Sequence, residues 1–156
     1  MPILSVGKAN RFRRGVTLIE MMVVVAIIGL IAAISYPSAA AGIDSARLIS
    51  ATDSVAAFLN SAVNRVERRQ QAIALTISVK ENRLYTFSNQ PGYTRELKMP
   101  DGISLEGPDD DRRLILMPGA TVPAIGIQLT NRRGLRRIVR LDPMTGFPRV
   151  ESVGKE

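Results

Sequence analysis

The sequence predicts an α+β fold in which one long N-terminal helix packs against an antiparallel β-sheet or sandwich of about seven or eight strands. Three observations predict this fold. An apolar block with a single ionisable residue covers residues 16–34. Apolar residues at helical spacing then continue up to residue 66. From residue 73 onward the apolar residues alternate with a period of two, between turns rich in Gly, Pro, Asn and Asp.

The composition excludes several classes of active site. The chain of 156 residues contains no Cys and no His. A disulfide, a Cys/His zinc site, a thiolate nucleophile and an imidazole base are therefore excluded, and with them a Ser-His-Asp triad. Carboxylate or Ser-Lys chemistry stays open, but no residue spacing indicates either. We predict that the protein is not an enzyme, with no catalytic residue, no cofactor and no metal site.

The first residues of the chain are basic. The formal net charge is +7, and four basic residues precede the apolar block without an acidic neighbour: Lys8, Arg11, Arg13 and Arg14. Without these four residues, 17 of the 21 basic residues remain against 14 acidic ones, so the net charge of the rest of the chain is +3. Positive charge beside an apolar span keeps that end in the cytoplasm. Much of the basic character therefore indicates membrane topology and not nucleic-acid binding.

The apolar block reads VTLIEMMVVVAIIGLIAAI, and Glu20 is its one ionisable residue. As a helix, 19 residues at about 1.5 Å each span roughly the hydrocarbon thickness of a bilayer. A secretory signal cleaved near residues 39–41, a plain single-span anchor and a prepilin leader all fit this block. A carboxylate inside an apolar span costs several kcal/mol unless it is paired. Glu20 therefore favours the prepilin interpretation.

The segment RRGVTLIE, residues 13–20, resembles the prepilin processing motif: a basic leader, Gly, a hydrophobic residue and T-L-x-E. The resemblance implies that a membrane peptidase cuts between Gly15 and Val16 and methylates the new N-terminus. Val16 stands where Phe or Met is commoner, a departure that we still expect to be processed. Pro37 falls where many pilins carry a helix-kinking proline, so we expect residues 35–37 to kink the helix or interrupt it briefly.

The charges of the processed segment suggest how subunits assemble. Cleavage creates a cationic amine at Val16, and Glu20 lies one helical turn further on. When subunits stack, this carboxylate can pair with the amine of a neighbour, so that each buried charge compensates the other. The expected partners are other pilins or pseudopilins, prepilin peptidase and the bacterial inner membrane. We expect a cytoplasmic N-terminus and a periplasmic C-terminal domain. The protein then leaves the membrane and joins a pilus or pseudopilus.

Helical periodicity resumes after Pro37. The apolar stripe consists of Leu48, Thr52, Val55, Leu59, Ala62 and Val66, broadened by Phe58 and Val63. We expect it to pack against a sheet, because a run of about three heptads is short for a coiled coil. The predicted organisation is a leader at residues 1–15, a transmembrane and assembly helix at 16–36, an amphipathic helix at 37–71 and a periplasmic β domain at 72–156.

The remaining chain alternates strands and turns. We expect strands at residues 73–80 and 84–87, around Leu97 and Met99, and at 103–105, 113–117, 125–129, 135–141 and 149–153. The first two form a hairpin. This layout, with ILMPGA at 115–120 and TGFPRV at 145–150, resembles the H-type pseudopilin and FimT-like minor pilin branch. The resemblance implies a minor structural subunit of a type II secretion pseudopilus or a type IV pilus.

A basic run precedes the last predicted strand. Arg132, Arg133, Arg136, Arg137 and Arg140 place five charges in nine residues. On a strand, Arg136 and Arg140 share one face, and Arg137 points to the other. One interpretation is an edge strand protected from aggregation by charge, and the other is phosphate binding by a surface patch.

Some FimT-like pilins bind DNA through a C-terminal Gly-Arg-x-Arg motif. In the matching segment, residues 146–149, only Gly146 and Arg149 agree with it. The alternative function is therefore a DNA-binding minor pilin for natural transformation. Its candidate residues are Arg132, Arg133, Arg136, Arg137 and Arg149. Because the motif is incomplete, we do not expect nucleic acid to be a partner.

The processing motif predicts that the mature chain starts at Val16 and carries an N-methyl group. The intact mass of the protein from cells with and without prepilin peptidase checks this. The enzyme-containing cells should yield the shorter, methylated chain. A mature N-terminus near Gly42 would instead establish a secretory signal.

Overall fold

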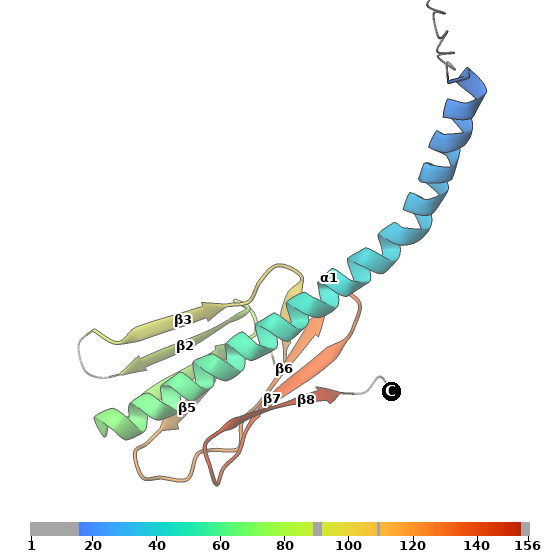
Figure 1. Cartoon of the computed structure of the whole chain (residues 1–156). Helices are drawn as coiled ribbons and strands as arrows, with labels where there is room; N and C mark the ends of the chain where they lie inside the picture. The colour runs from blue at the N-terminus through green and yellow to red at the C-terminus, as the bar shows by residue number, and fades with distance from the viewer. Residues whose placement is uncertain (1–15, 89–91, 109, 154–156) are drawn as a thin grey trace, which may run out of the picture. The chain divides into compact units, whose positions relative to one another are not determined.

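The computed structural model describes residues 16–88, 92–108 and 110–153 (Figure 1). The described residues form one helix and eight strands. Contacts within the chain divide it into two compact units, Met1–Ala39 and Ala40–Glu156. The second unit contains all the strands and the latter part of the helix.

Helix α1, Leu18–Arg69, is 52 residues long and belongs to both units. It continues through Pro37, so the brief interruption that the sequence allowed does not occur, whereas the kink stays a prediction. The helix ends where Gln70 adopts a left-handed backbone, with φ 51°. The N–H of Gln71 then donates to the carbonyl of Val66 at 3.3 Å, the closing bond of a Schellman motif.

The strands form two antiparallel sheets of four. The first has the order β3-β2-β1-β5 and the second the order β4-β6-β7-β8. The strand bounds are β1 Ile73–Ser78, β2 Arg83–Ser88, β3 Thr94–Lys98, β4 Ile103–Glu106, β5 Arg112–Leu116, β6 Gly126–Asn131, β7 Arg136–Leu141 and β8 Pro148–Val153. The predicted α+β class and the first hairpin are confirmed. The first predicted strand is shorter than expected, because residues 79–82 form the hairpin turn.

The core lies between α1 and the inner faces of both sheets. The predicted helical stripe is buried, and Val63 packs partly buried against it. The core residues from the strands include Ile73, Leu75, Ile77, Leu84, Leu105, Leu116, Ile127, Leu129, Val139 and Leu141. They alternate with exposed or half-buried residues because successive strand side chains point to opposite faces.

Two asparagines connect elements that do not pair as strands. Asn82, in the β1–β2 turn, donates from Nδ2 to the Ile103 carbonyl at 2.7 Å and accepts from the Leu105 N–H at 2.9 Å. It thereby ties the first sheet to β4 of the second. Asn131 accepts from two N–H groups of the β6–β7 turn and donates to the Asp44 carbonyl of α1 at 3.4 Å.

Gly146, in the β7–β8 turn, packs closely against the rest of the domain. Its φ is +68°, and a Cβ there would lie 3.1 Å from Cγ1 of Val63 and 3.4 Å from Cγ2 of Val122. Gly134 has a similar φ of +75°, but a Cβ there would meet no described atom within 4 Å. The two glycines therefore differ in packing and share the left-handed backbone.

We predict that Gly134→Ala lowers the free energy of unfolding of the β domain by about 1 kcal/mol, from backbone strain alone. Gly146→Ala should lower it by about 2–4 kcal/mol, because the contact with Val63 adds an overpacking cost. Urea unfolding of the detergent-solubilised chain, followed by tyrosine fluorescence, measures both. Equal losses for the two variants would contradict the close packing of Gly146.

Candidate functional site

The predicted processing segment lies at the start of α1. Gly15 falls outside the described residues, and Val16 and Thr17 precede the helix. The Thr17 Oγ1 accepts the Glu20 N–H at 3.3 Å, and the Thr17 carbonyl accepts the Met21 N–H at 3.2 Å. Thr17 is therefore the N-cap and Glu20 the third helical residue, the spacing of a capping box. The T-x-x-E pattern of residues 17–20 is the sequence signal for this capping role, which was not among the expectations above.

The first turns of α1 present a continuous apolar surface. Every large apolar side chain from Leu18 to Tyr36 is at least 45% exposed. Among the described residues, α1 is the one helix long and apolar enough to cross a membrane. An exposed apolar surface of this size is typical of a helix that lipid or neighbouring helices surround. Glu20 is the one carboxylate on it. Pro37 lies inside α1, and its predicted role in assembly stays a prediction.

The register places the candidate arginines on two faces of the second sheet. Arg136 and Arg140 point outward from β7, and Arg149 of β8 lies opposite Arg140. Arg137 lies opposite the buried Leu129 and so belongs to the inner face. Arg132 and Arg133 occupy the β6–β7 turn. The structure therefore does not gather these guanidinium groups on one surface.

Four of these arginines pair with carboxylates. The pairs are Arg133–Asp44 at 3.4 Å, Arg136–Glu106 at 3.3 Å, Arg140–Glu151 at 3.3 Å and Arg149–Asp142 at 3.2 Å. In the described part of the chain, no carboxylate pairs with Arg132 or Arg137. Partial compensation lowers the positive potential available to a polyanion. Asp44 and Glu106 lie far from their arginines along the chain, so the local sequence pattern does not indicate these two pairs.

The segment that aligns with the DNA-binding motif has structural contacts. Asp142 accepts the N–H groups of Met144 and Thr145 through Oδ1, at 2.9 and 3.2 Å. These bonds, and then the charge of Arg149, hold the pKa of Asp142 below its usual value. Gly146 fits against α1, as described above, and Arg149 closes the turn through Asp142. Both residues that match the motif therefore also stabilise the β7–β8 turn.

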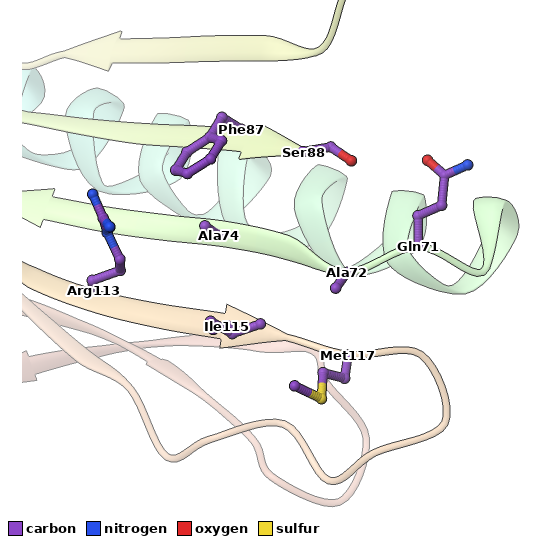
Figure 2. Close-up of a pocket in the computed structure, with 8 residues that line it drawn as sticks. All are labelled: Gln71, Ala72, Ala74, Phe87, Ser88, Arg113, Ile115 and Met117. Carbon is purple, nitrogen blue, oxygen red and sulfur yellow. The ribbon is translucent and has the colours of Figure 1, made fainter. Parts of the chain in front are cut away.

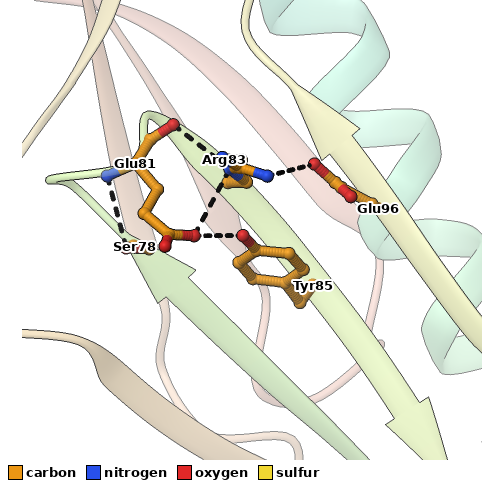
Figure 3. A network of polar contacts seen from close by, with 5 residues as sticks. All are labelled: Ser78, Glu81, Arg83, Tyr85 and Glu96. Carbon is orange, nitrogen blue, oxygen red and sulfur yellow. Dashed lines mark hydrogen bonds and ion pairs between the residues drawn. The ribbon is translucent and has the colours of Figure 1, made fainter.

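A second polar network lies on the exposed face of the first sheet (Figure 3). Arg83 bridges Glu81 at 3.3 Å and Glu96 at 2.9 Å, and the Tyr85 hydroxyl donates to the Glu81 carboxylate. The hydrogen bond to Glu96 raises the pKa of Arg83, and the bond to Glu81 raises the pKa of Tyr85. The raised pKa means that the phenol keeps its proton more readily than an isolated tyrosine does. The network therefore indicates cross-strand stabilisation.

An open groove of about 420 Å³ crosses the same sheet near the end of α1 (Figure 2). Its described lining is mostly apolar and consists of Gln71, Ala72, Ala74, Phe87, Ser88, Arg113, Ile115 and Met117. The Arg113 guanidinium lies 5.8 Å from the centre of the Phe87 ring. Arg113 is the one charged residue of this described lining, so the groove presents no acid–base pair.

Comparison with known protein families identifies the N-terminal segment. Residues 10–36 match the prokaryotic N-terminal methylation motif. This motif is the signal of type IV pilins and pseudopilins, and together with the helix-on-sheets architecture it supports the pilin-like superfamily. It also suggests a structural subunit and not an enzyme. No curated protein and no solved structure matches the chain.

We predict that the protein binds duplex DNA with a dissociation constant no tighter than about 10⁻⁴–10⁻⁶ M at physiological salt, the ordinary non-specific range. The reason is that the arginines lie on two faces and four of them pair with carboxylates. Fluorescence anisotropy over a salt series measures this. Tight binding with a steep salt dependence, lost in an Arg136→Ala/Arg137→Ala/Arg149→Ala variant, would make DNA capture the leading function.

Proposed function

We propose that this protein is a minor pseudopilin-like structural subunit of a type II secretion pseudopilus or a type IV pilus, processed by prepilin peptidase. One observation carries the proposal. The methylation motif of residues 10–36 includes an apolar helical surface, interrupted by a single carboxylate at Glu20. Such a surface suits a helix that first resides in a membrane and later packs among the helices of other subunits.

The start of α1 supports a role for Glu20 in pairing with a neighbour. Cleavage at Gly15 would leave a cationic amine at Val16, directly before the capping residue Thr17. In an apolar environment this amine and the Glu20 carboxylate each need a counter-charge. Pairing between subunits supplies both and sets the axial position of one helix against the next.

The apolar residues beside Glu20 provide the packing surface for that contact. An open groove on α1 is lined by Leu18, Met21, Met22, Val25 and Ala26. Long, unbranched methionines adapt to irregular neighbouring surfaces. We propose that the basic leader lies in the cytoplasm, that this helix crosses the inner membrane, and that the β domain lies in the periplasm.

DNA capture is the alternative function of a minor pilin, and the described contacts give it no specific support. Its candidate arginines are split between the turn, the outer face and the inner face of the second sheet. Four arginines of the C-terminal region contact carboxylates, and Arg149 also holds a turn. We therefore retain the structural role as the leading function.

We predict that Glu20→Ala leaves the protein processed and inserted in the membrane but poorly incorporated into filaments. Removing the carboxylate eases residence in the membrane, while the partner amine loses its counter-charge. Co-purification with the other filament subunits is the measurement.

Two variants serve as controls for this experiment. Met21→Ala shortens the adjacent side chain and keeps the carboxylate, so it should be incorporated far better than Glu20→Ala. Thr17→Ala removes the cap, which weakens the helix start by about 1 kcal/mol without removing the charge. Normal incorporation of the Glu20→Ala variant into filaments would contradict the proposed pairing of Glu20 with a neighbour's N-terminal amine.

A further inference from the structure

We propose that strand β8 pairs antiparallel with β8 of a second copy of this chain, centred on Val150. The β4-β6-β7-β8 sheet of one copy and the same sheet of the other copy thereby become one sheet of eight strands. This interface lies in the β domain and does not depend on the assembly role of α1. It rests on three features of β8: its open edge, an apolar row that ends at it and the order of its charges.

The first feature is the open edge. Strand β8 is the last strand in the order β4-β6-β7-β8, and β7 is its partner on one side. Among the described residues, no strand pairs with its other side. Every residue of β8 after Pro148 is exposed. Because backbone groups of a strand alternate in direction, part of its N–H and C=O groups point away from β7.

The second feature is an apolar row across the inner face of the sheet. The register places Ile127 opposite Val139, and Val139 opposite Val150. Ile127 and Val139 are buried, whereas Val150, the last member, is 39% exposed. A second copy paired at Val150 would continue the row symmetrically into its own Val150 and Val139. The pairing would therefore bury apolar surface that the single chain leaves in water.

The third feature is the order of charges along β8. Arg149 and Glu151 flank Val150 on the outer face, where each also contacts a residue of its own chain, Arg149 with Asp142 and Glu151 with Arg140. In the antiparallel register centred on Val150, Arg149 of each copy lies opposite Glu151 of the other, which makes two cross-strand ion pairs. Registers shifted by two residues put Arg149 opposite Arg149, or Glu151 opposite Glu151. A parallel in-register pair would put both like charges together.

The neighbouring turn supports the same register. Phe147, just before β8, is 61% exposed, and Val153 at the other end of the strand is 40% exposed. In the proposed register Phe147 lies next to Val153 of the second copy. The bonds of Asp142 and the close packing of Gly146 hold this turn before any partner arrives. A preorganised edge loses little conformational entropy on pairing.

Pro148 and the charges are also the means by which edge strands avoid aggregation. Here the charges disfavour the shifted and parallel registers and leave the one centred on Val150. A contact between identical surfaces of two copies is isologous and closes on itself. The proposed pairing therefore yields a dimer and does not extend further.

Because the sequence contains no Cys, a single engineered cysteine can test the proposed pairing by disulfide formation. In the full-length chain, expressed in cells and oxidised in isolated membranes, Val150→Cys should form a disulfide-linked dimer, because the two Val150 residues lie directly opposite. Ser152→Cys is the matched control, on the same face of the same strand. In the proposed register, residue 152 of one copy and residue 152 of the other lie four residues apart along the strands. This separation of about 13 Å is too long for a disulfide. No dimer from Val150→Cys, or equal dimer from both variants, would overturn the proposal.

Charge reversal in the Val150→Cys background tests the register. Arg149→Glu alone and Glu151→Arg alone place like charges opposite each other in both pairs, so each should give about tenfold less dimer. Co-expression of the two variants under different tags restores both ion pairs, so the mixed dimer should return to the parent level. Each charge reversal also removes an ion pair within its own chain, Arg149–Asp142 or Arg140–Glu151. The mixture controls for that loss, because it is the same in the mixed dimer as in each variant alone. A mixed dimer as weak as the two homodimers would refute this register.

Discussion

The β domain depends on one contact, the buried face of α1 between Leu48 and Val66. Val55, Leu59 and Ala62 have no exposed surface, and they cover the inner faces of two sheets that do not pair with each other as strands. Neither four-stranded sheet can cover its own apolar face. Because the chain has no cysteine, no disulfide replaces this packing. The helix that would anchor the protein in a membrane therefore also organises its β domain.

The local pattern of the sequence predicted the elements but not their partners. The helical stripe and the alternating strands are read from neighbouring residues, and the structure confirms them. The division into two sheets depends on distant contacts: β5 joins β1, although three strands lie between them in the sequence. The contacts of Asn82 also could not be predicted from the local sequence. A turn residue gives no indication that its side chain will form hydrogen bonds with the backbone of β4.

The C-terminal arginines illustrate how a charge run can mislead. Alternation along the strand correctly separated Arg137 from Arg136 and Arg140, since it depends on backbone geometry alone. The run gave no indication that Asp44 and Glu106 would lie beside Arg133 and Arg136. In contrast, the T-x-x-E pattern at residues 17–20 indicates the helix cap from neighbouring residues alone, although the same residues belong to the processing motif.

The position of Thr17 has an electrostatic consequence for the timing of assembly. Thr17 caps the start of α1 and Val16 lies before the helix, next to the bond at which prepilin peptidase is proposed to cut. Cutting there would replace a neutral amide with a positive charge at the positive end of the helix dipole, where a cation is disfavoured. Processing would therefore leave the mature helix with an uncompensated cation. A neighbour's carboxylate would relieve that cost, so the cut itself would favour the joining of subunits.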